Sequence, residues 1–318
     1  MRPYTTQIRN RQLEMSKGVH RFALLVAGAT FFLIIAGANV TSHDAGLAVP
    51  DWPLAFGKFF PKMVGNVFWE HGHRLVATTV GILTIVLAVY LQVRERRAWV
   101  KRLGWIALGG VIAQGLLGGL TVKLNLPLAV SAAHATLAQL FFLTTVSLAV
   151  FTSHGWIEPP AQVRTEGTGV SLRTLCVVAL VAILIQLVLG ATLRHSATWD
   201  QPLPAGLLLS HIAGAIVVTV VLGATVVTVL TRYRAENYLK RPALIAAGLL
   251  FVQLVLGVTA YLVRASSPND PQPLNPMISV TVAHVACGAL VFAATIVLTL
   301  RAFRILRVER QAYALATA

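Results

Sequence analysis

Eight long apolar segments dominate this sequence and restrict what it can fold into. A helix needs about 20 apolar residues to cross a bilayer. The 318-residue chain is 56% hydrophobic and only 12% charged, whereas soluble globular proteins carry about 25% charged residues. Composition therefore excludes a soluble enzyme, a disordered chain and a disulfide-stapled secreted module. We predict an all-α integral membrane protein with transmembrane helices over 21–41, 67–93, 103–122, 128–151, 172–193, 205–231, 242–263 and 278–300.

The basic residues are distributed unevenly between the two ends of these segments. Of the 26 lysines and arginines, 20 lie in the two terminal stretches and in the connections after the second, fourth and sixth segments. Because cytoplasmic loops of membrane proteins are enriched in Lys and Arg, we expect both termini in the cytoplasm and a multi-pass protein of the cell membrane. The net charge of +15 follows from this distribution and does not indicate a nucleic-acid partner.

A short motif recurs near the end of the odd-numbered segments. In the third, fifth and seventh segments a glutamine precedes a glycine by four residues. The first segment ends more loosely around Gly37, and this likeness favours a retained helix over a cleaved signal peptide. Small residues at these places permit close helix approach or leave room for a flat ligand. The pairs are Gln114 with Gly118, Gln186 with Gly190, and Gln253 with Gly257.

Each even-numbered segment carries a histidine about six residues from its expected start. At about 1.5 Å rise per residue, these side chains lie about 9 Å below the outer boundary. A single histidine in an apolar helix is most simply a satisfied core residue. Polar groups in a membrane interior are costly and mark functional sites, so four at matching depth favour a function. The four are His73, His134, His211 and His284.

The repeat divides the chain into two homologous four-helix bundles, 1–155 and 156–318, each with two of these histidines. Two imidazoles facing each other across a bundle suit the axial coordination of a haem iron. Zinc is disfavoured because each half offers too few converging ligands. We therefore predict one bis-histidine haem site in each half.

The two halves differ beside their first histidine. Glu70 precedes His73 by three residues, and residues at this spacing share a helix face. The corresponding positions in the other even segments are Ser131, Leu208 and Thr281. We interpret Glu70 as a carboxylate that stabilises positive charge or relays protons beside a bound substrate. The alternative is a solvated interfacial residue near the helix start.

Taken together, these features resemble the haem A synthase family, membrane enzymes that oxidise haem O to haem A for cytochrome oxidases. The resemblance rests on eight segments in two similar halves, the four histidines, and the stretch from Glu70 to Arg74. The outer loop Pro50-Asp51-Trp52-Pro53-Leu54 also resembles that family's first outer loop. Some members carry cysteine pairs in outer loops. Here Cys176 and Cys287 lie inside apolar segments, where we expect small buried side chains.

The resemblance implies a division of labour between the halves. His73 and His134 would line the substrate haem site with Glu70 as the catalytic residue, and His211 and His284 would ligate a permanent haem b. The implied reaction hydroxylates one porphyrin methyl group stepwise, and loss of water from the gem-diol leaves a formyl group. Implied partners are the haem O-producing farnesyltransferase and a membrane electron donor. Candidate contacts for haem propionates at the outer ends of the segments are Arg74, Lys123, Arg194 and Arg264.

Two other functions remain open at this point. A di-haem b transmembrane electron carrier explains four histidines, but leaves Glu70 and the long loop 42–66 without a role. Its haems also more often lie at two depths. A transporter is disfavoured because no Asp, Glu, Lys or Arg lies at the centre of any segment, where coupled transporters usually place ionisable groups.

Overall fold

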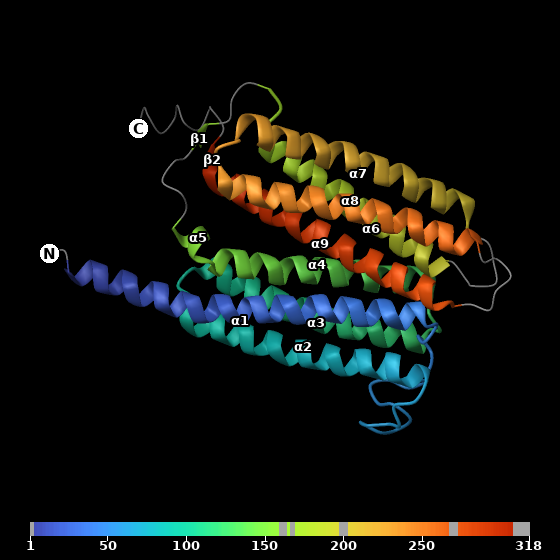
Figure 1. Ribbon diagram of the computed structural model, residues 1–318. Coiled ribbons are helices and arrows are strands. Elements are labelled where there is room, and N and C mark those ends of the chain that lie inside the picture. The colour runs from blue at the N-terminus through green and yellow to red at the C-terminus, as the bar shows by residue number, and fades with distance from the viewer. Residues whose placement is uncertain (1–2, 159–163, 166–168, 197–202, 267–272, 308–318) are drawn as a thin grey trace.

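The computed structural model describes residues 3–158, 164–165, 169–196, 203–266 and 273–307, and within them it contains eight helices long and apolar enough to cross a membrane (Figure 1). The predicted multi-pass, helical membrane protein is thereby confirmed. The eight are α1 (Pro3–Ser42), α2 (Asn66–Arg94), α3 (Ala98–Lys123), α4 (Leu128–Thr152), α6 (Leu172–Ser196), α7 (Ala205–Arg232), α8 (Asn237–Ser266) and α9 (Asn275–Ile305).

The helices run longer than the apolar segments that predicted them. In α1 the helix begins at Pro3, while the stretch suited to a membrane begins at Lys17. Helix α9 begins at Asn275, three residues earlier than expected, with Leu274 as its N-cap and Pro276 in its first turn. Proline favours this position because its fixed φ suits a helix start and its missing N–H is not needed there.

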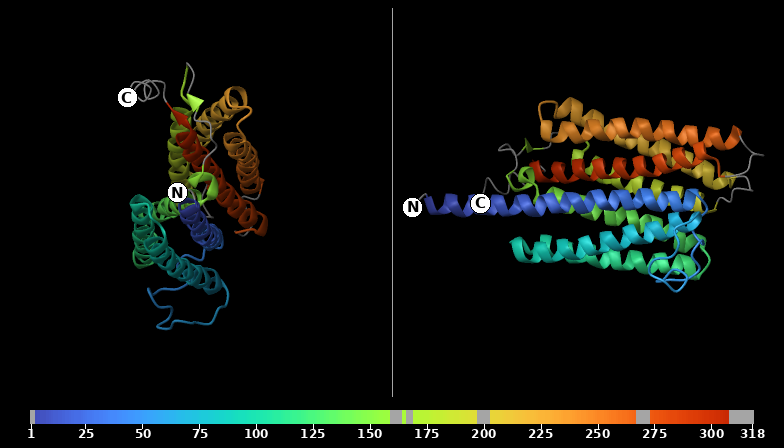
Figure 2. Two further views of the ribbon diagram at one scale, coloured as in Figure 1. Left: turned by 90° about the vertical axis from the view of Figure 1, so that its left-hand side faces the viewer. Right: turned by 60° about the horizontal axis from the view of Figure 1, so that its bottom comes forward.

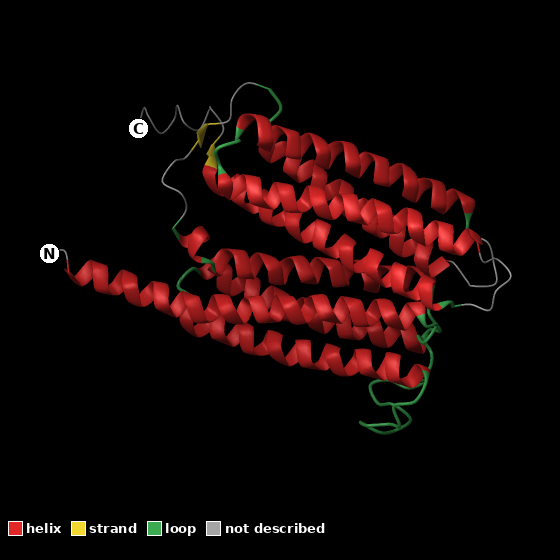
Figure 3. Ribbon diagram, in the orientation of Figure 1, coloured by secondary structure: helices red, strands yellow, loops and turns green. Residues whose placement is uncertain are grey.

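Besides the long helices, the described residues form three short elements. They are α5 (His154–Ile157), β1 (Arg164–Thr165) and β2 (Leu306–Arg307). The two strands pair in parallel, Arg164 opposite Leu306, and Figure 3 shows this small pair beside the end of α9. It joins the connection after α5 to the end of the last helix.

The long helices share one axis direction and define two ends of the molecule. Helix α1 begins and α9 ends at the same end, as the right-hand view of Figure 2 shows. We call this the basic end, because the Arg-rich turn between α2 and α3 also lies there. The opposite end carries the long connection 43–65 between α1 and α2, and we call it the loop end.

Two cores and a junction hold the helices together. One core is shared by α1, α2, α3 and α4, with Val26, Leu87 and Leu148 buried in it. The other is shared mainly by α6, α7, α8 and α9, with Leu222 and Leu298 at its centre. A smaller cluster joins α1, α4 and α9 through Ile34, Phe142, Ala289 and Ala293. The end-on view in Figure 2 shows the same grouping.

Candidate functional site

The four predicted histidines make the same contact four times. Each ring packs with its Cε1 atom against a glycine of the preceding long helix. A Cβ placed on that glycine would lie only 3.0–3.2 Å from Cε1. Because that spacing is tighter than ordinary side-chain contact, only glycine leaves the imidazole undisturbed. The pairs are Gly37 with His73, Gly118 with His134, Gly190 with His211, and Gly257 with His284.

The glutamine of the recurring motif reaches the same histidine. Gln114 donates from Nε2 to the backbone oxygen of His134 at 2.9 Å. Gln186 donates to the backbone oxygen of His211 at 2.9 Å and lies 3.1 Å from its Nδ1. Gln253 lies 3.2 Å from Nε2 of His284. A spacing of four residues is about one helical turn, so glutamine and glycine flank one ring from a single helix face.

The first helix lacks this glutamine. Four residues before Gly37 the chain has Leu33, a buried residue of the first core. His73 therefore has the glycine contact without the amide that accompanies the other three histidines. The two halves thus differ at the level of the histidine environment as well as at Glu70.

The histidines are brought together in pairs. The rings of His211 and His284 have centroids 6.4 Å apart and are inclined by 69°. A metal bound to both rings at about 2.0–2.1 Å would hold the ring centres roughly 6 Å apart. His73 and His134 lie within electrostatic range of each other. The structure therefore places His211 and His284 close together, and it brings His73 and His134 into range of each other.

Buried nitrogen atoms at these rings lack partners among the residues that the structure describes. Nδ1 of His73, of His134 and of His284 is buried and accepts or donates no hydrogen bond there. Unsatisfied buried polar atoms are rare and call for an explanation, such as an ion or a ligand. Within the described ranges no three His, Cys, Asp or Glu side chains converge on one point. What the fold offers is two pairs of imidazoles, and imidazole nitrogen is a donor that suits haem iron.

The glycine contact gives a first testable prediction. Gly257→Ala should push the His284 ring out of position, lowering the haem absorbance and the free energy of unfolding by about 1–3 kcal/mol, as overpacking typically does. Absorbance spectra and thermal unfolding of the purified protein measure both. Gly248→Ala on the same helix is the matched control, because nothing lies within 4 Å of its Cβ position. Equal effects in the two variants would contradict the role assigned to the contact.

The carboxylate of Glu70 is buried, with only 4% of the residue exposed, so it is not a solvated interfacial group. Its Oε1 accepts a hydrogen bond from Nη2 of Arg74 at 2.5 Å. Its Oε2 accepts the backbone N–H of Val49 at 2.7 Å. Arg74 in turn donates to the carbonyl oxygens of Asp51, Leu54 and Val49 at 2.7, 3.0 and 3.2 Å. The pair holds the loop 43–65 against the start of α2.

Other contacts pin the same loop over the first half. The indole of Trp52 lies against Gly119 so closely that a Cβ there would stand 2.6 Å from Cδ2. His71 is buried, and its Nε2 lies 3.0 Å from the carbonyl oxygen of Phe59. The N–H groups of Gly57 and Phe56 donate to the carboxylate of Asp51 and hold the pKa of that carboxyl below its ordinary value.

Basic side chains gather at the loop end where the two halves meet. Arg194 and Arg264 lie within electrostatic range of each other, with Asp44 also in range of Arg194. Arg194 also donates to the hydroxyl of Ser42 at 3.3 Å. Lys123 lies at the end of α3 and is exposed. Two guanidinium groups close together favour an anionic ligand between them.

Sequence reasoning gave no role to three residues that the structure places at this end. His195 lies within electrostatic range of His134, although it belongs to α6 in the other half. His71 and Trp52 fasten the loop. The sequence signal for Trp52 was its place in the loop motif. His195 carried no such signal, because its proximity to His134 depends on how the halves pack.

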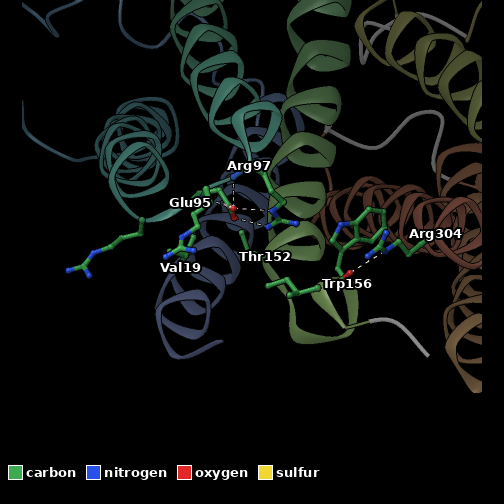
Figure 4. Close-up of a pocket in the computed structure, with 9 residues that line it drawn as sticks. Val19, Glu95, Arg97, Thr152, Trp156 and Arg304 are labelled. Atoms are coloured by element: carbon green, nitrogen blue, oxygen red, sulfur yellow. Dashed lines mark hydrogen bonds and ion pairs between the residues drawn. The ribbon is translucent and has the colours of Figure 1, made fainter. Parts of the chain in front are cut away.

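A cavity of about 150 Å³ lies at the basic end, away from these histidines (Figure 4). Its walls include the bidentate ion pair between Arg97 and Glu95, in which Nη2 lies 2.7 Å from Oε2. Burial raises the pKa of Glu95, but the hydrogen bonds from Arg97 outweigh it and hold the pKa below its ordinary value. Arg304 stacks over Trp156. Arg97 also donates to the carbonyl oxygen of Phe151, so this cluster ties the α2–α3 turn to α4.

Comparisons with known proteins give one consistent result. Residues 62–200 match the family model described as cytochrome oxidase assembly protein. The chain is 28% identical over 261 residues to the haem A synthase of Symbiobacterium thermophilum, an alignment covering 76% of this chain and 85% of that protein. It is 33% identical over 141 residues to the haem A synthase of a Caulobacter species, covering 40% and 41%. The haem A synthase of Bacillus licheniformis is 24% identical over 192 residues, covering 58% and 61%.

Proposed function

The chain belongs to the haem A synthase family, and we propose that it is a membrane oxidoreductase that oxidises haem O to haem A for cytochrome oxidases. The observation that supports this most is the repeated glycine–histidine contact, which presents four partly buried imidazoles in two pairs near the loop end. The similarity to haem A synthases extends over 76% of the chain and covers both halves.

We further propose different tasks for the two pairs. His211 and His284 would hold a resident haem b, which supplies one-electron chemistry when bound. His73 and His134 would hold the substrate haem O. Gly190 and Gly257 keep the rings of the haem b pair in place. Gly37 and Gly118 do the same for the rings of the haem O pair. The bundles around the pairs correspond to residues 1–155 and 156–318.

Glu70 would act at the substrate side. Its carboxylate is held by Arg74 and by the backbone of Val49, so its position is rigid before any substrate binds. A positioned carboxylate of this kind can stabilise positive charge that develops on the substrate and carry the proton released as its methyl group is oxidised. The loop above it is held against the first half by the contact of Trp52 with Gly119.

The arginine pair supports a place for the haem propionates. Arg194 and Arg264 lie at the loop end within electrostatic range of each other, and charge-assisted contacts of guanidinium with carboxylate are among the strongest hydrogen bonds. We propose that propionates face the loop end, with Lys123 and Arg74 as the other basic groups there. A structure of the loaded protein with propionates directed to the basic end would contradict this orientation.

The basic end would face the cytoplasm and the loop end the outside of the cell membrane, since Lys and Arg mark the cytoplasmic side. The haem O-producing farnesyltransferase and a membrane electron donor are the partners that this reaction requires. An electron carrier with two haems b is not favoured by the family matches, and the four histidines all lie near the loop end.

Extraction of the pigments from purified protein tests the proposal directly. The expected result is haem B together with haem O or haem A, because one pair would hold the resident cofactor and the other the substrate or product. Haem B alone, at two equivalents per chain, would overturn the synthase assignment in favour of the carrier. Expression in cells that make no haem O is the matched control, in which the second pigment should disappear.

A further inference from the structure

The tip of the loop at the loop end exposes a group of large apolar side chains outside the long helices. Phe59 is 77% exposed, Phe60 79% and Val64 73%, and Phe56 and Met63 are exposed as well. An exposed apolar group of this size on a folded loop usually marks a binding surface. We call residues 56–64 the aromatic tip.

The aromatic tip is held in one shape rather than left loose. Ala55 and Lys58 form an antiparallel bridge with hydrogen bonds of 2.9 and 3.0 Å. The carboxylate of Asp51 accepts the N–H groups of Phe56 and Gly57 at 2.6 and 2.8 Å. His71 holds the carbonyl oxygen of Phe59. The loop backbone that carries the phenyl rings is therefore ordered, so binding through these rings would cost little further conformational entropy.

The loop extends sideways from the helices. In Figure 1 the connection between α1 and α2 lies beside the outer end of α2 and turns back along it, instead of continuing along the helix axes. The end-on view in Figure 2 shows it projecting well away from the helices, and the other view places it level with the helix ends. When helices span a bilayer, a segment level with their ends lies where lipid headgroups meet acyl chains.

The charge of the loop suits that zone. Lys58 and Lys62 flank the phenyl rings and are exposed. From Trp52 to Trp69 the sequence has no Asp or Glu. The apolar surface continues onto the exposed Phe68 of α2. Aromatic and basic residues together are typical of segments that lie in the membrane interface, with their apolar groups about 5–10 Å deep in the headgroup boundary.

We propose that the aromatic tip inserts into the leaflet at the loop end, with Phe59 and Phe60 among the upper acyl chains and Lys58 and Lys62 at the lipid phosphates. The insertion anchors the loop from the lipid side, while Arg74 and Trp52 anchor it from the protein side. The loop that covers the first half is thereby fixed at both edges. This inference is independent of the reaction proposed above.

Fluorescence quenching of the full-length protein in lipid vesicles tests the insertion. A fluorophore on Phe60→Cys reports depth, and labelling is selective because Cys176 and Cys287 are buried. Phe60 is highly exposed, so the substitution removes few contacts. Val220→Cys, 65% exposed in the middle of α7, is the lipid-facing control. Glu158→Cys, exposed at the end of α5, is the water-facing control.

We expect nitroxide lipids labelled near the headgroup to quench the Phe60→Cys probe several-fold more than the Glu158→Cys probe. Nitroxides at the acyl-chain end should quench it less than they quench the Val220→Cys probe. Aqueous iodide should quench it several-fold less than the Glu158→Cys probe. Quenching by iodide equal to that at Glu158→Cys, with none by lipid, would overturn the proposal and leave a protein partner as the occupant. A second probe at Phe59→Cys must agree.

Discussion

Replacing His284 by alanine should remove the haem b that we propose for the second half while leaving the first half able to bind haem O. Removing a residue that only hydrogen-bonds to a metal-ligating side chain already lowers metal affinity about 10–100-fold. Removing the ligating side chain itself should lower the affinity for haem at least as much. The expected result is disappearance of a low-spin haem absorbance, with haem O still recovered from the protein. Spectra and extracted pigments measure the two quantities separately.

A histidine at the other end of the molecule provides the control for that variant. His20 lies in α1, and its Nδ1 is 2.9 Å from the carbonyl oxygen of Ala149. His20→Ala removes an imidazole and a hydrogen bond without touching either pair, so its haem content should equal that of the parent. An unchanged haem B content in His284→Ala would refute the assignment of the second pair.

Replacing Glu70 by glutamine should slow the oxidation without removing haem. Glutamine keeps the size of the side chain but loses the negative charge and the ability to take up a proton. General acid–base assistance is typically worth about 10²–10⁴-fold in rate. We expect a normal haem b content and accumulation of haem O, or of its hydroxylated form, in place of haem A. Pigment analysis of membranes containing the variant measures the ratio.

The contacts of Glu70 with the loop require a second variant beside it. Asp51→Asn replaces the carboxylate that accepts the backbone N–H groups of Phe56 and Gly57. It therefore weakens these hydrogen bonds and loosens the loop without changing Glu70. If Glu70 acts only by holding the loop, both variants should lose haem A to a similar degree. We expect a large loss in Glu70→Gln and a small one in Asp51→Asn. Production of haem A at the parental rate by Glu70→Gln would refute any role in the chemistry.

Much of the architecture was predictable because a bilayer imposes simple rules. A helix satisfies its own backbone hydrogen bonds, so an apolar stretch of sufficient length is enough to specify a spanning segment. All eight expected segments lie within long helices of the structure. The motif in which glutamine precedes glycine by four residues was also visible. Its spacing is about one helical turn, and the structure shows both residues at the same histidine.

The loop partner of Glu70 was not predictable from local spacing, whereas its other partner, Arg74, lies four residues further along the same helix, a spacing at which side chains meet. The three-residue spacing placed Glu70 on the helix face of His73, but its carboxylate contacts Arg74 and the backbone of Val49. A side chain near a helix end can turn towards whatever covers that end, and here a loop of 23 residues (43–65) covers it. Its path depends on contacts such as Trp52 against Gly119, which local periodicity does not encode.

The sequence by itself determined the spans, the uneven distribution of basic residues and the glycine and glutamine that accompany the histidines, because each of these depends on residues within one helix or on helix length. Only the tertiary structure decided which side chains from different helices meet. His195 of α6 comes near His134 of α4, and Arg194 comes near Arg264 of α8. Such meetings follow from the packing of apolar faces, and many arrangements of eight apolar helices would satisfy the bilayer equally well.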